Sequence, residues 1–170
     1  QLHSIMSLSK TSMALAVGRQ WADGRINLSG RIGDYLPEMG TAYIDATVQQ
    51  VLDMNWSNNY SEDFSDPKAD VWRHEWVAGW RVLDHEPPTL REFLASFGGG
   101  RPNASDEIDY KDANTDVLAW VVERVSGQSL CDHIRNLAEA AGIEGTLFIG
   151  CDRTFLPIVS FCFSLTARDL

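Results

Sequence analysis

The sequence predicts a largely helical chain that folds as one unit. Apolar residues recur at helical spacing in several segments, and most of these segments begin at a capping residue or end at a glycine. The 170 residues are 44% hydrophobic and 22% charged, which is typical of a globular chain and excludes disordered and fibrous classes. Residues 1–170 contain no internal repeat, no low-complexity tract and no linker, so we treat them as one domain or part of one.

Helices are expected wherever the apolar period of about 3.6 residues coincides with a start or stop signal. Capping-box spacing marks the starts at Thr47 and Thr89, and glycines mark the stops at Gly24 and Gly127. The expected helical segments are 7–23, 47–55, 71–82, 89–97, 114 or 115 to 127, and 129–142.

The connecting segments are polar, and the last quarter of the chain has a different pattern. Residues 25–37 predict an ordered surface connection, and residues 56–70 are dense in Asn, Ser and Asp, which favours a long loop. Residues 146–149 and 158–161 are β-branched and aromatic and fit either short strands or buried loop. The chain begins inside a helical pattern and stops in a capped first turn at 166–170, so we expect an internal portion of a larger protein.

The charge balance and the lengths of the apolar runs exclude two classes of partner. A formal charge of −10 repels phosphate backbones and anionic lipids, so a nucleic-acid partner is not expected. The longest apolar runs, such as 155–163, are too short to span a bilayer, and no transmembrane helix is expected. The sequence does not indicate an oligomeric state.

Cysteines, histidines and acidic residues give no metal-binding pattern. Cys131, Cys151 and Cys162 are odd in number and lack CxxC spacing, so we expect free buried thiols, which favour a reducing, cytoplasmic compartment. The four histidines have no ligand spacing and predict surface or capping positions. The acidic run at 62–70 lacks the glycine and terminal Glu of an EF-hand loop and is interpreted as a solvated face. No metal and no cofactor are expected.

Aromatic residues in the middle of the chain allow two interpretations. Trp72, Trp76 and Trp80 recur every four residues and could line a substrate groove, but core packing is the favoured interpretation. Trp56 and Tyr60 are weaker candidates for the rim of a substrate pocket. Gly98-Gly99-Gly100 has no strand before it and no helix after it, so it does not predict a phosphate-binding loop.

The pattern SxxK occurs at Ser7-Leu8-Ser9-Lys10, at the start of the first expected helix. Spacing of three residues places the Ser7 hydroxyl and the Lys10 amine on one helix face, where a lysine in a dry pocket can take the serine proton. The helix N-terminus adds a favourable dipole for an oxyanion beside Ser7. On the motif alone, a helix cap with a solvated lysine is the favoured interpretation. Ser65-Asp66-Pro67-Lys68 matches the same pattern, but it lies in a polar loop with no helix and no apolar wall.

Short motifs along nearly the whole chain occur in an order and at a spacing typical of a known family. These motifs are Ser7-Leu8-Ser9-Lys10-Thr11, Trp21 to Ile26, Asp34 to Glu38, Gly40 to Tyr43, Val51 to Met54, Tyr60 to Phe64, Tyr110 to Trp120, Val122 to Gly127 and Leu165 to Leu170. The chain resembles the serine β-lactamase-like, penicillin-recognising family, in the branch of class C β-lactamases, related esterases and 6-aminohexanoate-dimer hydrolases. The stretch from Gly40 to Trp80 is most similar to the last of these. The resemblance implies an α+β fold of which residues 1–170 hold a mainly α part, the nucleophile helix and the helical domain, with most of the sheet missing.

The resemblance also implies roles for individual residues. Ser7 would be the acylating nucleophile, Lys10 its partner in proton transfer, and Tyr110 the second-motif tyrosine that carries the proton to the leaving group. Without the resemblance, Tyr110 would be interpreted as a half-buried aromatic residue with a satisfied hydroxyl. The implied partner is a small-molecule ester or amide, and this chemistry requires no cofactor.

The sequence departs from the family pattern at the second motif. Many relatives have Tyr-x-Asn, whereas this chain has Tyr110-Lys111-Asp112 and an asparagine only at Asn114. A carboxylate at position 112 cannot donate the amide hydrogen bond that would hold a substrate carbonyl, which weakens the β-lactam interpretation. Asp112 and Asn114 therefore join Trp56 and Tyr60 as weak substrate-binding candidates. The third motif, which would supply an oxyanion-hole amide, is expected beyond Leu170.

The leading hypothesis is a serine hydrolase that cleaves an ester or amide through an acyl-enzyme intermediate on Ser7. Small esters are the first expectation, followed by linear amides such as aminohexanoate oligomers, D-alanyl peptides and β-lactams. The alternatives are a non-catalytic homologue that acts as a binding or scaffolding module, and a truncated, inactive fragment.

Overall fold

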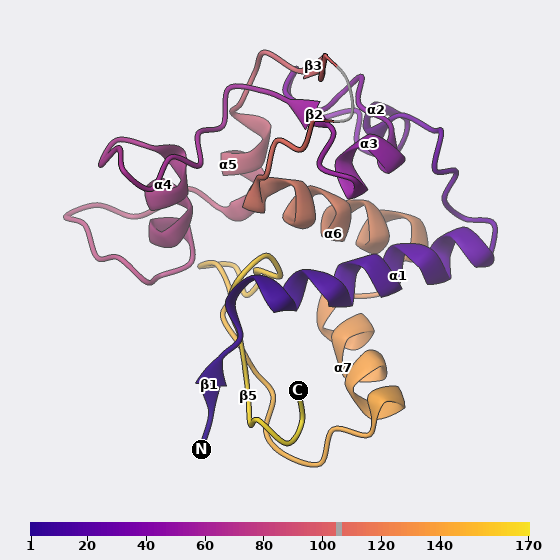
Figure 1. The fold of residues 1–170 in the computed structure, drawn as a ribbon, viewed down its shortest axis with the longest axis vertical. Helices are drawn as coiled ribbons and strands as arrows, with labels where there is room; N and C mark the ends of the chain where they lie inside the picture. Colours follow the sequence, from indigo (N-terminus) through magenta and orange to yellow (C-terminus); the bar gives the residue numbers. More distant parts are fainter. Residues whose placement is uncertain (105–106) are drawn as a thin grey trace.

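The structure, a computed structural model, describes residues 1–104 and 107–170. Figure 1 shows a helical body with a small sheet at the end where the two chain termini lie. The helices are η1 (Met6–Ser9, a 3₁₀ turn), α1 (Lys10–Ala22), α2 (Ile32–Tyr35), α3 (Val48–Leu52), α4 (Asp70–Val77), α5 (Leu90–Ala95), α6 (Asp112–Ser126) and α7 (Leu130–Ala141). The strands are β1 (His3–Ser4), β2 (Trp56–Ser57), β3 (Arg101–Pro102), β4 (Phe148–Ile149) and β5 (Phe163–Leu165).

Helix α6 is the centre of the helical body. Every residue from Asp112 to Val122 is buried, because α1, α2, α3 and α7 all pack against this helix. Figure 1 shows α1 running alongside α6, with α7 below them. Gly127 ends α6 with a φ of 67°, a left-handed conformation that a glycine adopts without steric penalty. The burial of α6 on all sides means that polar residues in its first turns must find partners inside the protein.

Two small antiparallel sheets complete the fold. In the first, β5 lies between β1 and β4, with His3 opposite Leu165 and Phe148 opposite Ser164. In the second, β2 pairs with β3 and Trp56 lies opposite Pro102. The first sheet matters for the site because the Ile5 amide donates to the Phe163 carbonyl at 2.9 Å, which fixes the chain immediately before Ser7.

The structure confirms the predicted helices and corrects several details. The surface connection 25–37 contains the short helix α2, and the predicted loop 56–70 begins with strand β2. Both predicted alternatives for the last quarter of the chain occur: β4 lies within 146–149, and 158–161 is buried without strand pairing of its own, with the last strand, β5, starting only at Phe163. Two-residue strands such as β2 and β3 form because distant segments pair with each other. Local sequence patterns therefore do not predict them.

Helix α4 turns a different face to the core from the one predicted. Its buried residues are Val71, His74 and Val77, whereas Trp80 lies beyond the helix and is 45% exposed. The tryptophan stripe is therefore not the core face, and His74, expected at the surface, is fully buried. Trp72 and Trp76 are only partly buried, so side-chain size did not identify the buried face of this helix.

The cysteines are less uniform than predicted. Within the described part of the chain all three thiols are free, but only Cys162 is buried; Cys151 is partly buried and Cys131 is exposed. The same residues contain no cluster of three or more His, Cys, Asp or Glu that could hold a metal ion. Among residues 1–104 and 107–170, no helix combines the length and the apolar character needed to cross a membrane.

Candidate active site

Ser7 lies in a tight turn that is built by the residues on either side of it. The 3₁₀ turn η1 holds Ser7, and α1 begins at Lys10. Because residues three apart eclipse one another in a 3₁₀ turn, Ser7 and Lys10 are stacked on one side. Met6, directly before Ser7, has a φ of 47°, a left-handed conformation that costs a non-glycine residue about 1–3 kcal/mol. The Ser9 hydroxyl stabilises the turn by donating to the Met6 carbonyl at 2.8 Å.

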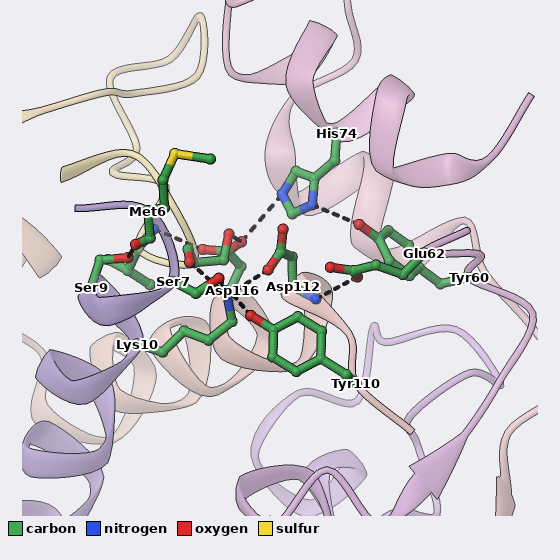
Figure 2. A network of polar contacts seen from close by, with 12 residues as sticks. Met6, Ser7, Ser9, Lys10, Tyr60, Glu62, His74, Tyr110, Asp112 and Asp116 are labelled. Atoms are coloured by element: carbon green, nitrogen blue, oxygen red, sulfur yellow. Dashed lines mark hydrogen bonds and ion pairs between the residues drawn. The ribbon is translucent and has the colours of Figure 1, made fainter. Parts of the chain in front are cut away.

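The hydroxyl of Ser7 accepts hydrogen bonds from two side chains. Lys10 Nζ donates to Ser7 Oγ at 3.1 Å, and Tyr110 Oη donates to the same oxygen at 2.5 Å. Tyr110 is 41% exposed and stands directly before α6, so the two residues meet although they are 103 positions apart. Figure 2 shows the side chains of Ser7, Lys10 and Tyr110 converging. Ser7 itself is exposed.

Lys10 uses all three of its N–H donors. Besides Ser7, its ammonium donates to Asp112 Oδ1 at 2.5 Å and to the Ser160 carbonyl at 2.7 Å. Burial by itself would lower the pKa of Lys10, but the charge of Asp112 and the hydrogen bonds to Asp112 and Tyr110 outweigh it and raise the pKa above its ordinary value. Lys10 is therefore a cation in the resting site, whereas the sequence suggested a neutral amine.

Asp112, the residue that departs from the family pattern, is the counter-ion of Lys10. The side chains of the pair are only 13% and 8% exposed. Asp112 opens α6, and its own backbone N–H donates to Glu62 Oε2 at 2.7 Å. Burial and the nearby charge of Asp112 raise the pKa of Glu62 to about 7. Asp112 thus acts on the lysine, and the carboxylate has no hydrogen-bond donor to offer a substrate carbonyl.

A buried polar cluster holds the Ser160 carbonyl in place behind Lys10. Asp116, one turn along α6 from Asp112, accepts the Val159 amide at 2.8 Å and the Ser160 hydroxyl at 2.6 Å. His74 Nε2 lies 3.2 Å from Asp116 Oδ2, and His74 Nδ1 lies 3.2 Å from the Tyr60 hydroxyl. Figure 2 shows this cluster next to Lys10 and Asp112. Asp116 therefore positions the Ser160 carbonyl that Lys10 contacts.

Replacing Asp116 with asparagine is expected to lower the free energy of unfolding by about 1–3 kcal/mol. The amide has one acceptor oxygen where the carboxylate has two, so the Val159 amide or the Ser160 hydroxyl loses its partner in a buried environment. Urea denaturation measures the effect. Asp45→Asn is the control, because Asp45 forms an exposed ion pair with Arg31 and should change stability by no more than about 1 kcal/mol. Equal effects of the two substitutions would contradict the assigned role of Asp116.

The weaker site candidates lie inside the protein. Trp56 is 4% exposed and donates from Nε1 to the Ala42 carbonyl at 2.6 Å, and Tyr60 is 1% exposed. Asn114 is fully buried and accepts the Tyr43 hydroxyl at 2.8 Å. These three side chains are used for packing and internal hydrogen bonds, so we do not include them in a substrate site. At the second SxxK match, Ser65 Oγ donates to Asp63 at 2.6 Å in an exposed turn.

Sequence reasoning missed four residues of the site: Glu62, His74, Asp116 and Ser160. Two signals could have indicated some of them. Polar residues at 112, 114 and 116 interrupt an apolar helix, and Ser160 interrupts the apolar run 155–163. Buried polar residues require partners, so such interruptions point to an internal polar cluster. Nothing in the local sequence singles out Glu62 among its acidic neighbours.

Known proteins resemble this chain in sequence and in fold. The Beta-lactamase family model matches residues 1–152. The chain is 38% identical over 173 residues to the 6-aminohexanoate-dimer hydrolase of Paenarthrobacter ureafaciens, covering 99% of this chain and 43% of that protein. Among solved structures, a Bacillus anthracis protein that carries the name 6-aminohexanoate-dimer hydrolase superposes on this chain with a TM-score of 0.83 at 24% identity. The match covers 99% of this chain and 45% of that protein. EstCE1, a hydrolase with promiscuous acyltransferase activity, gives a TM-score of 0.71 at 16% identity, with 99% and 56% covered.

These matches extend over almost the whole of the chain, which in turn spans less than half the length of the curated relative. The structural matches confirm the expected fold, a mainly helical part of the β-lactamase-like α+β architecture. The family model covers far more than half of the residues, including Ser7, Lys10 and Tyr110. The chain therefore belongs to the β-lactamase family.

Proposed function

We propose that this protein is a serine hydrolase that cleaves an ester or amide through an acyl-enzyme intermediate on Ser7. The observation that carries the proposal is the placement of Ser7 Oγ, which lies 3.1 Å from Lys10 Nζ and 2.5 Å from Tyr110 Oη. A serine hydroxyl is a weak nucleophile until a neighbouring group takes its proton, and this arrangement supplies a tyrosine for that purpose with a lysine cation beside it.

In the proposed mechanism the Tyr110 phenol first gives its proton to solvent, and Ser7 Oγ then attacks the substrate carbonyl carbon while its own proton passes to the Tyr110 phenolate. Because Lys10 is a cation at rest, Tyr110 is the better base, and the ammonium, 5.0 Å from the centre of the tyrosine ring, stabilises negative charge on the phenolate. Tyr110 then gives the proton to the leaving oxygen or nitrogen as its bond to the acyl carbon breaks. Water attacks acyl-Ser7, its proton passes to Tyr110, and the acid leaves as Ser7 regains a proton.

The proposed substrates are small esters and linear amides. The relative from Paenarthrobacter ureafaciens is named for hydrolysis of a linear amide dimer, which favours aminohexanoate-type amides as a substrate class beside esters. Asp112 stands where a substrate-binding amide is expected in many relatives, so β-lactams are the less favoured class. The site requires no cofactor for this chemistry.

Labelling with a fluorophosphonate probe tests the proposal directly. Ser7 should displace fluoride from the probe, and intact mass should show one adduct that is absent in Ser7→Ala. Ser65→Ala is the matched control, because Ser65 belongs to the other SxxK match and forms only an exposed turn.

The result separates the hydrolase from the other interpretations. A folded chain that gains no adduct, or one that keeps its adduct in Ser7→Ala, would remove Ser7 as the nucleophile. Reversible ligand binding with an unmodified Ser7 would instead support a non-catalytic binding module.

A further inference from the structure

Glu62 is connected to the site through the first residue of α6. Its Oε2 accepts the Asp112 backbone N–H at 2.7 Å and so caps the buried start of this helix from a segment fifty positions away. Figure 2 shows the Glu62 carboxyl group beside Asp112, on the opposite side of Asp112 from Ser7. A change of charge on Glu62 is therefore felt directly by the residue that pairs with Lys10.

The second oxygen of Glu62 has an unfavourable environment for a negative charge. Among the described residues, Oε1 is buried and has no hydrogen-bond partner. A buried carboxylate oxygen without a donor is costly, and protonation of that oxygen removes the cost. The neighbouring Asp112 carboxylate adds repulsion, because two carboxylates in one site do not readily carry two charges. Both effects favour a neutral Glu62, in agreement with its pKa of about 7.

Few other charges face Glu62. Lys10 is the cation, and its charge acts in the opposite direction from that of Asp112. The remaining ionisable neighbours are Lys111, which pairs with Asp109 at 3.0 Å, His74, whose Nε2 lies 3.2 Å from Asp116 Oδ2, and the neutral phenols Tyr43 and Tyr60. Burial raises the pKa values of the two phenols, so they remain neutral around pH 7. Glu62 is the group in this cluster whose pKa is raised to about 7, by burial and by the charge of Asp112.

We propose that Glu62 is a positioning residue that controls the pH dependence of Ser7 acylation through Asp112 and Lys10. When Glu62 is protonated, Lys10 and Asp112 form a neutral pair. When Glu62 is ionised, this pair has one additional negative charge next to it, on the side of Asp112 away from Ser7. This inference rests on the proposed function, since it concerns the same reaction on the same serine.

The direction of the effect follows from the charges that develop during acylation. Attack by Ser7 places negative charge on the tetrahedral oxyanion, and Tyr110 must lose its proton before it can accept one. A surplus negative charge on Glu62 opposes both events. We therefore expect acylation to slow as Glu62 ionises, so that the wild-type rate carries a component that falls as pH rises through about 7.

The test compares the pH profile of fluorophosphonate acylation in the wild type and in Glu62→Gln, from pH 5 to pH 9. Glutamine mimics the protonated acid, because its carbonyl can accept the Asp112 N–H while its side chain stays neutral. The component near pH 7 should disappear, and at the alkaline end the variant should react about threefold to tenfold faster than the wild type. Asp63→Asn is the matched control, since this adjacent carboxyl is exposed and hydrogen-bonds within its own turn.

Thermal unfolding supplies a second readout that does not depend on Ser7 chemistry. A carboxyl whose pKa is raised in the folded protein stabilises it fully below the unfolded value, near 4.5, and that contribution is lost as pH rises through the folded value, about 7. The Tm of the wild type should therefore fall relative to that of Glu62→Gln over this interval. The difference between wild type and Asp63→Asn should not show this fall, because burial does not raise the pKa of Asp63 above its ordinary value.

The two readouts distinguish the possible failures. A Tm difference that is flat with pH would show that Glu62 does not titrate in this range and would overturn the inference. A Tm difference with the expected slope, combined with an unchanged acylation profile, would leave Glu62 as a helix cap without influence on the reaction and would overturn it equally. If the wild type forms no adduct at any pH while the Tm difference is present, the proposed function is contradicted. The inferred control of acylation by Glu62 is then contradicted as well, although Glu62 still titrates.

Discussion

Replacing Lys10 with methionine is expected to remove acylation of Ser7 and to destabilise the fold. Methionine keeps the apolar stem and deletes the ammonium, which leaves the Asp112 carboxylate, 8% exposed, without its counter-ion. Breaking a buried ion pair by removing one partner costs about 3–5 kcal/mol. Loss of the cation beside Tyr110 and Ser7 should slow fluorophosphonate acylation by roughly 10²–10⁴-fold. Urea denaturation and labelling rates measure the two effects.

The double variant Lys10→Met/Asp112→Asn separates stability from reactivity. Asparagine removes the stranded charge but keeps the backbone N–H that Glu62 accepts. Most of the lost stability should return, whereas the labelling rate should stay as low as in the single variant. If the double variant recovered reactivity together with stability, Lys10 would be a structural residue with no part in the reaction.

Replacing Tyr110 with phenylalanine is expected to lower reactivity as strongly as Lys10→Met does, but to change the stability of the fold very little. The tyrosine is 41% exposed, and its hydroxyl donates to Ser7 Oγ at 2.5 Å. Deleting a positioned acid or base slows a reaction by about 10²–10⁴-fold, whereas a substitution at a partly exposed site changes the free energy of unfolding by roughly 0.5 kcal/mol or less. Labelling rate and urea denaturation are again the measurements.

Tyr35→Phe is the control for this substitution. The Tyr35 hydroxyl accepts the Asn27 amide at 2.8 Å and has no contact with the site, so its loss should leave the labelling rate unchanged. A Tyr110→Phe protein that reacts as fast as the wild type would leave Ser7 without its proposed base and would move that role to Lys10.

Some of this site could be predicted from sequence because part of the geometry is local. The three-residue spacing of Ser7 and Lys10 places both groups on one side of a helical turn, whichever fold surrounds them. Local pattern also located the helices, since caps and glycine stops act within a few residues. The pattern alone could not choose between Ser7 and Ser65; a proline and a polar environment argued against the second, and the structure places it in an exposed turn.

The rest depends on contacts between distant segments. Helix α6 begins at Asp112, earlier than its apolar pattern indicated, because Glu62 satisfies the first amide from another part of the chain. The same reason explains the burial of Trp56 and Tyr60, whose polar atoms have internal partners. Tyr110 could be named from the family resemblance, but its approach to Ser7 follows from the packing of α1 against α6.

The hydrogen bonds that define the site join residues very far apart along the chain. Tyr110 lies 103 positions from Ser7, and Asp112 and Ser160 lie 102 and 150 positions from Lys10. Closing loops of this length is entropically unfavourable until the intervening segments have packed, so these bonds should form late in folding. In a newly synthesised or partly unfolded chain, Ser7 would lack its contact with Tyr110, and Lys10 would lack its contacts with Asp112 and Ser160. Because the partners of Ser7 and Lys10 come from distant segments, the proposed reactivity of Ser7 depends on tertiary structure. Its rate of labelling by an electrophile would therefore report the fraction of chains that have completed folding.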